Sequence, residues 1–311
     1  MKGENSPSVN NGHIENFIYP LPPLAEQERI VAKIEELMPW VEQYGKAQSE
    51  LDQLNNSLQG RLRKSILQYA IEGKLVPQQA EDGSAEELLA EIQAEKQRLY
   101  AAGKLKKKDL AHSTIFRAED GMYYEQVGKT ITCINEEIPF DLPDGWVWGR
   151  GRTLFLPMES TRPSGEAFIY IDVDAVNNQT HRVDNPKRIL TVDAPSRASR
   201  KLHESDVLFS MVRPYLRNIA LISKELSDAI ASTGFYVITP SVGIYSKFLY
   251  YLVLSPYVVD GINAFMKGEN SPSVNNGHIE NFIYPLPPLT EQQRIVSKIE
   301  EVLGVLNRLG Q

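Results

Sequence analysis

Apolar side chains in the first quarter of the chain recur at alternating steps of three and four residues. One series comprises Ile30, Leu37, Tyr44, Leu51 and Leu58, and the other comprises Ile34, Val41 and Leu62, with Gln48 and Asn55 at its intervening positions. A seven-residue repeat of this kind is typical of a coiled-coil seam, in which a polar residue such as Asn55 fixes the register. The pattern predicts one helix from about residue 26 to residue 72, roughly 70 Å long at ~1.5 Å per residue.

A seam of this length needs a second element to cover it. Packing of the helix on its own domain is one alternative, and a second long helix is the other. The helical pattern that begins again at Thr290 stops at Gln311, so it cannot cover the whole seam. We therefore expect the partner helix to come from another chain, which predicts dimerisation.

A second helical pattern begins at Ser84, where Ser84 and Glu87 form a capping box, and Gly103 is expected to end it. The sequence KLKKK from Lys104 to Lys108 carries four lysines. It is either a solvated tail or a contact for DNA phosphates or a partner subunit. The polar residues from His112 to Glu137 predict a linker or a small hairpin.

The pattern changes character from Pro139, where short apolar runs alternate with turn residues. The runs that predict strands are Phe168–Ile171, Val207–Phe209, Ile219–Ile222 and Phe235–Ile238, and those that predict helices are Ser246–Leu254 and Pro256–Phe265. We expect an α+β fold in which a mixed α/β domain of about 150 residues is joined to long antiparallel coiled-coil helices.

One segment occurs twice. Residues 1–24 and 266–289 share the sequence MKGENSPSVNNGHIENFIYPLPPL, and similarity continues as AEQERIVAKIEEL in the first copy and TEQQRIVSKIEEV in the second. Each copy predicts a loop, a short strand, a stop at the prolines and then a helix. Thr290 and Gln293 form a capping box that the first copy loses, because it has Ala25 at the first position.

The two copies lie at opposite ends, which excludes a solenoid repeat. They indicate a chain cut from a longer tandem arrangement, with the tail of one module at each end. The alternative is a recent gene duplication without structural consequence.

Composition limits the class of protein. The chain has 311 residues, of which 42% are hydrophobic, and this predicts two domains or one domain plus an extended element. No apolar stretch approaches the ~20 residues that span a bilayer, and the N-terminus has no apolar signal region. The single cysteine, Cys133, excludes an internal disulfide and a cysteine-rich zinc site. Together these features predict a cytoplasmic protein.

Charge is distributed unevenly. The formal net charge of −7 is unusual for a nucleic-acid binder. The segment from Arg197 to Arg217, however, contains five basic residues and only two acidic ones. Contact with phosphates depends on such local clustering of charge and not on the net charge of the chain. Any single arginine here also fits an ordinary surface position. The candidate DNA-contacting residues are Ser160, Thr161, Arg162, Arg197, Ser199, Arg200, Lys201, Arg213, Tyr215, Arg217, Asn218, Lys267, Asn270, Ser271 and Asn275.

Motifs for catalysis are not found. The sequence Gly128–Thr130 lacks the preceding glycine of a phosphate-binding loop, since Tyr123 stands there, and the five histidines show no metal-ligand spacing. Asp172 and Asp174 fit a carboxylate pair for Mg²⁺, but alternating positions on a strand are more often one face of an ordinary sheet. We expect no catalytic residue, no metal and no cofactor.

Several motifs in a fixed order resemble those of one family. They are PLPPLxEQxRIVxKIEE at Pro20 and Pro285, SILQYAIEGKLVPQ at Ser65, AEELLAEIQAEKQRL at Ala85, LPDGWVWGR at Leu142 and APSRASRKLHESDVLFSMVRPYLRNIALI at Ala194. This order resembles the DNA specificity subunit of type I restriction–modification systems, in a half-length or truncated form.

The resemblance implies a division of the chain. The implied parts are residues 1–24, an orphan tail of a target-recognition domain; 25–75, a conserved coiled-coil helix; 76–138, a conserved region with a second helix and a linker; 139–289, a target-recognition domain; and 290–311, the start of a second conserved helix.

The resemblance also implies partners. A specificity subunit binds a half-site of a bipartite target in double-stranded DNA through each recognition domain, methyltransferase subunits dock on its helices, and a motor nuclease subunit joins for cleavage. We expect this chain to be non-catalytic and to act as a homodimer or together with another half subunit. Two alternatives are a coiled-coil scaffolding protein whose α/β domain binds protein, and a degenerate product that recognises nothing.

Overall fold

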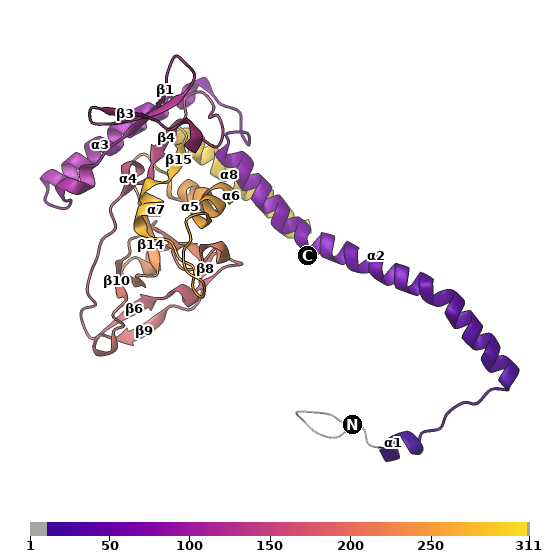
Figure 1. The fold of residues 1–311 in the computed structure, drawn as a ribbon. Helices are drawn as coiled ribbons and strands as arrows, with labels where there is room; N and C mark the ends of the chain where they lie inside the picture. The colour runs from indigo at the N-terminus through magenta and orange to yellow at the C-terminus, as the bar shows by residue number, and fades with distance from the viewer. Residues whose placement is uncertain (1–10, 310–311) are drawn as a thin grey trace. The chain divides into compact units, whose positions relative to one another are not determined.

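The computed structural model describes residues 11–309, except the side chains of Asn55, Asn56 and Leu309. The chain divides into two parts, residues 1–58 and residues 59–311. The first part holds α1 (Asn11–Glu15) and most of α2 (Leu24–Ile71), and the second holds all other elements (Figure 1). None of the described helices combines the length and the apolar character that a bilayer crossing requires.

The predicted long helix is confirmed as α2, which has 48 residues and continues through Pro39. Its predicted seam is bare: the side chains of Ile30, Ile34, Leu37, Val41, Tyr44, Leu51, Leu58 and Leu62 are all exposed. Asn55 lies within the helix, but its side chain is outside the described part. Exposure of a continuous apolar stripe is unfavourable in water, so the expectation that a partner covers it stands as a prediction.

The second predicted helix is also confirmed, as α3 (Ala85–Ala101). The hydroxyl of Ser84 accepts a hydrogen bond from the backbone N–H of Glu86, 3.1 Å away, and caps its N-terminus. Beyond its end, Gly103 adopts a positive φ of 72°.

Residues 112–137, for which the sequence predicted a linker or a small hairpin, are more regular than a linker and larger than one hairpin. These residues form a three-stranded antiparallel sheet of β1 (Thr114–Arg117), β2 (Tyr123–Val127) and β3 (Thr130–Cys133). Ile115 and Ile134 are buried beside it with Trp148. Strands of four or five residues with at most one buried side chain give too weak an alternation to recognise in sequence alone.

Two four-stranded sheets form the centre of the second part, and all four predicted strands are confirmed within them. The first has the order β10 (Ala198–Lys201), β13 (Ile230–Ser232), β6 (Ala167–Ile171) and β9 (Lys187–Leu190), and the second has the order β12 (Ile219–Leu221), β11 (Val207–Ser210), β14 (Phe235–Pro240) and β5 (Phe155–Leu156). Only the pair β13–β6 is parallel within these sheets. A short ladder joins β7 (Val176–Asn177) to β8 (Arg182–Val183).

Helices and one further ladder complete the second part. The helices are α4 (Gly151–Leu154), α5 (Ser246–Leu254), α6 (Pro256–Asn263), α7 (Asn276–Asn281) and α8 (Leu289–Leu309), and the ladder pairs β15 (Ile283–Leu286) with β4 (Val147–Arg150). The predicted helices 246–254 and 256–265 correspond to α5 and α6.

Two details of the duplicated sequence differ from expectation. Pro285 does not end the strand but lies inside β15, opposite Trp148. A proline is tolerated at this position because β15 pairs with one strand only, β4. The N–H that proline lacks is therefore not needed for a hydrogen bond to a second strand. Thr290 does not cap α8, which begins at Leu289; its hydroxyl donates to Asp82 instead, 2.9 Å away.

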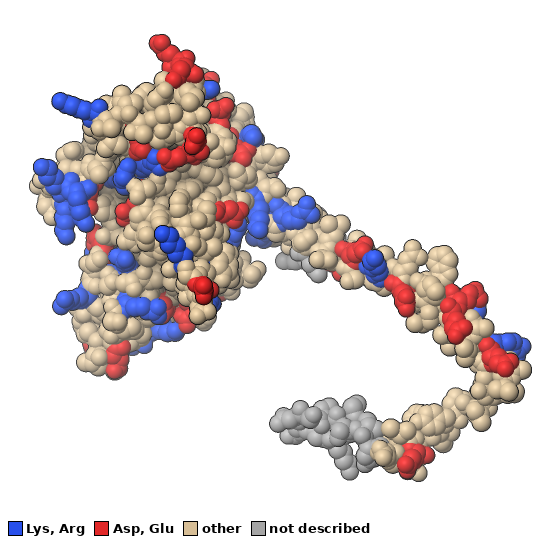
Figure 2. Space-filling model, viewed as in Figure 1, with Lys and Arg blue, Asp and Glu red and all other residues tan. Residues whose placement is uncertain are grey.

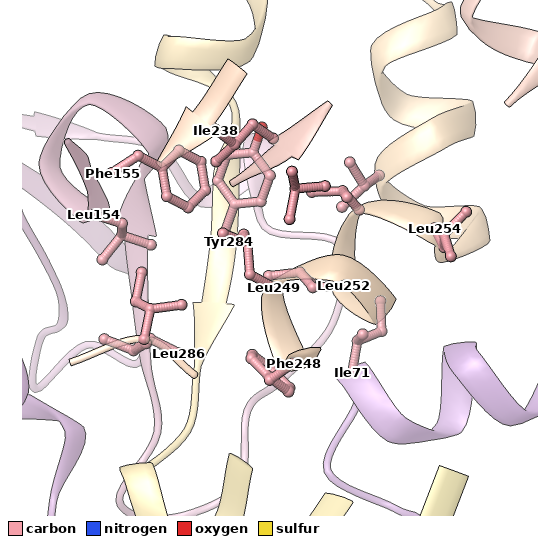
Figure 3. Packing of buried hydrophobic residues seen from close by; sticks show 14 of the residues in the cluster. Ile71, Leu154, Phe155, Ile238, Phe248, Leu249, Leu252, Leu254, Tyr284 and Leu286 are labelled. Atoms are coloured by element: carbon pink, nitrogen blue, oxygen red, sulfur yellow. The ribbon is translucent and has the colours of Figure 1, made fainter. Parts of the chain in front are cut away.

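One large hydrophobic core joins the sheets to the helices. It includes Leu67 and Ile71 at the end of α2 and Ile295 of α8, together with residues of α3, α5 and α6. Figure 3 shows the ring of Tyr284, which is fully buried, facing that of Phe155 with centroids 5.0 Å apart. The sequence that is exposed near the N-terminus is therefore central to the core in its second copy.

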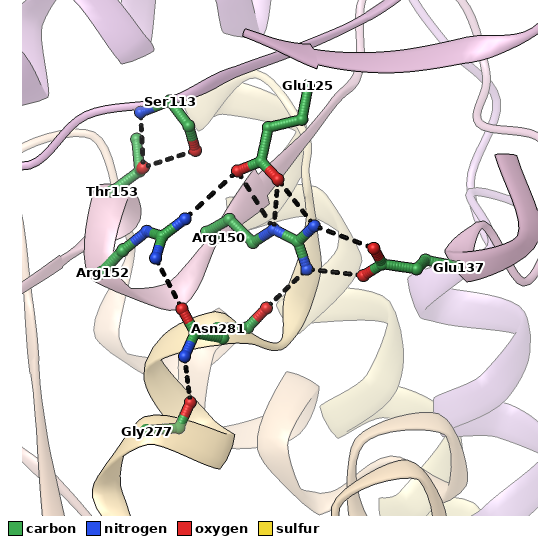
Figure 4. A network of polar contacts seen from close by, with 8 residues as sticks. All are labelled: Ser113, Glu125, Glu137, Arg150, Arg152, Thr153, Gly277 and Asn281. Carbon is green, nitrogen blue, oxygen red and sulfur yellow. Dashed lines mark hydrogen bonds and ion pairs between the residues drawn. The ribbon is translucent and has the colours of Figure 1, made fainter. Parts of the chain in front are cut away.

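A buried arginine ties the small sheet to this core (Figure 4). The Arg150 guanidinium lies 2.7 Å from a carboxylate oxygen of Glu125 and 2.7 Å from one of Glu137, and it donates to the backbone carbonyl of Asn281. Burial alone would raise the pKa of Glu125, but the hydrogen bond and charge of Arg150 hold it below its ordinary value. The stability that this pair contributes is present above the ordinary glutamate pKa and is lost as the pH falls through the folded-state pKa.

We predict that Arg150→Met lowers the free energy of unfolding by about 3–5 kcal/mol, because the Glu125 carboxylate stays buried without its partner. The matched control is Arg117→Met, since Arg117 is exposed and its ion pair with Asp141 spans 3.9 Å; a change within about 0.5 kcal/mol is expected there. Denaturant unfolding measures both, and equal effects would contradict the prediction. The double variant Arg150→Met/Glu125→Gln should regain part of the loss.

Candidate nucleic-acid interface

The predicted DNA-contacting segments are linked by backbone hydrogen bonds. The N–H of Thr233 donates to the carbonyl of Arg197 at 2.9 Å, and the N–H of Met211 donates to the carbonyl of Gly234 at 2.8 Å. The N–H of Arg213 donates in turn to the carbonyl of Pro272 at 2.8 Å. Segments far apart in sequence therefore follow one another along one edge of the domain. We call residues 160–162, 197–201, 211–213 and 267–275 the basic edge.

A strained arginine and a small loop form one end of the basic edge. Arg213 has a φ of 47°, a left-handed conformation that is costly for a residue with a Cβ. Its guanidinium donates to the carbonyl of Asn270 at 2.9 Å, and Lys267 and Ser273 exchange backbone hydrogen bonds that close the loop. Arg213, Lys267, Asn270 and Ser271 are all exposed. The structure brings these predicted residues together and presents them to solvent.

The other end of the basic edge combines the loop after β5 with β10. The N–H of Thr161 donates to the carbonyl of Ser199 at 2.9 Å, and Ser160 forms a bridge with Arg200. Arg162 is exposed. The Nε atom of Arg200 is buried and has no hydrogen-bond partner among the described atoms. Predicted residues from two separate segments thus share this end of the edge.

Two basic residues of the edge are already paired. Arg197 lies 3.2 Å from Asp172, and Lys201 lies 3.2 Å from Glu159. Both basic side chains remain about half exposed, so these pairs are worth little in water. A phosphate replaces such a carboxylate at small cost.

Three predicted residues are held by the fold. The Asn218 amide donates to the carbonyls of Val173 and Val176, at 3.1 and 2.9 Å. The Arg217 guanidinium is half-buried and donates to the carbonyl of Leu254, and burial lowers its pKa. Asn275 caps α7 by accepting from the N–H of His278. Their positions favour a structural role. Tyr215, between Arg213 and Arg217, is exposed.

The aspartate pair is arranged differently from expectation. Strand β6 ends at Ile171, so Asp172 and Asp174 lie in the following turn and not on a strand face. Asp172 pairs with Arg197, and Asp174 lies 3.0 Å from Lys187. Among residues 11–309, no group of three or more histidine, cysteine, aspartate or glutamate side chains is placed to hold a metal ion.

Two further basic groups lie outside the basic edge, and the sequence offered only the second, Lys104 to Lys108, as a possible phosphate contact. Lys187 and Arg188 are exposed on the edge strand β9, beside β6. The lysines between Lys104 and Lys108 are exposed after the end of α3. Figure 2 shows Lys and Arg side chains at the end of α3 and over the region of β6, β9 and β10, with a few acidic side chains among them. The sequence shows Lys187 and Arg188 as two adjacent basic residues. Only the pairing of β9 with β6 shows that they lie near Asp172.

Comparisons with known proteins agree on one family. Residues 158–309, which contain the whole basic edge, match the type I restriction modification DNA specificity domain. The specificity subunit of the type I restriction enzyme EcoAI from Escherichia coli is 28% identical over 346 residues, covering 95% of this chain and 54% of that protein. The EcoEI specificity subunit from the same organism is 27% identical, covering 81% of this chain and 40% of that protein.

A solved structure also matches. The HsdS subunit from Thermoanaerobacter tengcongensis is 37% identical with a TM-score of 0.52, covering 56% of this chain and 46% of that one. The chain spans about half the length of the curated relatives it matches.

We predict that Asn218→Ala lowers the free energy of unfolding by about 1–3 kcal/mol, because the partly buried carbonyls of Val173 and Val176 lose their donor. Asn270→Ala is the matched control, since the exposed Asn270 contributes only its backbone carbonyl to a described hydrogen bond; we expect a change within about 0.5 kcal/mol. Urea unfolding of both variants checks this. A larger loss in Asn270→Ala than in Asn218→Ala would show that the assignment is wrong.

Proposed function

Because this chain belongs to the specificity subunits of type I restriction–modification systems, we propose that it recognises a DNA sequence and performs no catalysis itself. The observation that carries the proposal is the continuity of the basic edge, which four segments build inside the matched domain. We propose that residues 139–289 recognise DNA. The regions proposed to bind the partner subunits are residues 25–75, 76–138 and 290–311.

The basic edge suits contact with a duplex. Arg162, Arg213 and Lys267 are exposed cations for phosphates, and Arg can also bind guanine through two hydrogen bonds. The exposed Asn270 and Ser271 next to them offer donors and acceptors for base edges or the backbone. The negative net charge of the chain is compatible with this, because phosphate contact depends on the local field.

Recognition of a bipartite target requires two recognition domains, and we propose that α2 supplies the pairing. The bare seam of α2 fits a second long helix, in a homodimer or with another half subunit. A homodimer has the same surface on both sides, so its two half-sites form an inverted repeat. Methyltransferase subunits then dock on the helices, and a motor nuclease subunit joins the complex for cleavage.

The competing function is a coiled-coil scaffold whose α/β domain binds protein. It shares the bare seam of α2 but gives no reason for basic side chains from four segments to meet on one edge. It therefore predicts no DNA affinity even at low salt, and this separates the two proposals.

We predict that Arg213→Gln and Lys267→Gln each weaken binding to a random-sequence duplex. Each should also reduce the slope of log affinity against log salt by about 1, because each removes one phosphate contact. Arg117→Gln, an exposed arginine of β1, is the control and should leave the slope unchanged. Fluorescence anisotropy across a salt series measures all three variants. No affinity of the unaltered chain at low salt would favour the scaffold.

We predict that Leu51→Asp raises the dissociation constant of the pair by at least roughly tenfold, because it places a charge in an apolar seam. Gln53→Asp lies on the same helix outside the seam and introduces the same side chain, so it should not change the dissociation constant. Analytical ultracentrifugation of the full chain compares them. A monomeric unaltered chain at micromolar concentration would remove pairing through α2 and leave the DNA proposal standing.

A further inference from the structure

Residues 276–299 close the recognition domain. This segment, comprising α7, β15 and the first half of α8, is called the closing element here. Its β15 strand pairs with β4, and its side chains fill the core. The buried residues of the closing element are Ile279, Ile283, Tyr284, Pro285, Leu286, Pro287, Pro288, Glu291, Gln292, Ile295, Val296 and Ile299.

Residues 11–34 reproduce this docking face completely. We call them the N-terminal copy. Every buried position of the closing element has an identical counterpart there, from Ile14 for Ile279 to Ile34 for Ile299. The three differences are Ala25 for Thr290, Glu28 for Gln293 and Ala32 for Ser297, and all three positions are exposed in the closing element. The duplication therefore repeats a complete interaction surface and not only a stretch of sequence.

The apolar side chains of the N-terminal copy are exposed to solvent. The exposed fraction of Ile18 is 90%, whereas that of its counterpart Ile283 is 3%, and the values for Tyr19 and Tyr284 are 63% and 0%. The corresponding site in the recognition domain of the same chain is already filled by the closing element. Docking of the N-terminal copy at such a site would bury these side chains and expose those of the closing element that it displaces, so the apolar surface in contact with water would change little.

The N-terminal copy already has the internal geometry of the closing element. Helix α1 corresponds to α7, and the Tyr19 hydroxyl donates to the carbonyl of Ile14 just as that of Tyr284 donates to Ile279. The Asn16 amide likewise donates to Gly12, as Asn281 does to Gly277.

The aromatic rings match as well. The centroids of Phe17 and Tyr19 are 5.3 Å apart, and so are those of Phe282 and Tyr284. A segment that holds its bound shape before binding loses less conformational freedom on docking.

The receiving site is specific for this shape. A Cβ on Gly151 would lie 2.5 Å from the carbonyl oxygen of Ile279, and one on Gly261 would lie 2.6 Å from the ring of Phe282. The backbone of the site therefore packs directly against the closing element at these two glycines. No bulkier residue fits at either glycine without movement of the closing element.

Polar groups of the site bind atoms that the N-terminal copy also has. Arg150 donates to the carbonyl of Asn281 at 2.7 Å, Tyr257 donates to that of Ile283 at 2.9 Å, and Trp146 donates to the Glu291 carboxylate at 2.8 Å. The counterparts in the N-terminal copy are Asn16, Ile18 and Glu26.

We propose that the N-terminal copy binds the recognition domain of a second copy of this chain, where it replaces the closing element and adds a strand to β4. Both segments present the same docking face, so the contacts formed equal those released, and exchange of identical elements is a low-cost route to association. The proposal does not depend on DNA binding. Of the α2 seam it uses Ile30 and Ile34 and leaves the residues from Leu37 to Leu62 for pairing.

The test traps the exchange with a disulfide in the full chain. Val147 lies opposite Leu286 in the β4–β15 ladder, and Leu21 is the counterpart of Leu286. In a Cys133→Ser background, which removes the only native cysteine, Val147→Cys with Leu21→Cys should give covalent dimers under mild oxidation. Val147→Cys with Leu286→Cys should close within one chain and verifies that the paired positions can form the bond. Val147→Cys with Gln53→Cys gives the rate of random collision.

The same substitution in the two segments should act in opposite directions. Ile18→Ala weakens the incoming segment and should slow dimer trapping by at least roughly tenfold, as expected for loss of a buried isoleucine side chain. Ile283→Ala weakens the resident segment and should speed it. Dimer formation at the collision rate, or a trapping rate that Ile18→Ala leaves unchanged, overturns the proposal.

Discussion

The pairing of β15 with β4 is the interaction on which the rest of the second part depends. It brings Tyr284 into the core beside Phe155 and places α8 against the same core as the end of α2. Arg150, the last residue of β4, adds the link to the small sheet through Glu125. One short ladder therefore connects the core to the small sheet of β1, β2 and β3 and to α8.

The regular parts of the fold could be predicted because their signals are local. Helix α2 follows from a seven-residue repeat, and the four predicted strands follow from short apolar runs between turn residues. For the sheet of residues 114–133 the sequence left a linker and a small hairpin as alternatives, because its short strands are stabilised by the packing of Ile115 near Trp148. Pro285 and Thr290 were misinterpreted for the same reason: the number of partner strands and the position of Asp82 are tertiary facts.

The candidate site was predictable in its segments but not in its individual residues. Residue type identified the region around Arg197 and Arg213, and the structure joins it to Lys267 through main-chain hydrogen bonds. Sequence could not show that Asn218 binds two partly buried carbonyls, or that Asp172 and Asp174 lie beside basic side chains. These hydrogen bonds and ion pairs form because the tertiary fold brings together polar groups that would otherwise be left without a partner.

The two copies of the duplicated segment have a consequence for proteolysis. Phe17 and the residue after it, Ile18, are exposed, whereas Ile283, the counterpart of Ile18, is almost fully buried. A protease that cleaves after aromatic residues needs its target strand free to enter the cleft of the enzyme. Digestion would therefore discriminate between two peptides of one sequence by their tertiary surroundings alone.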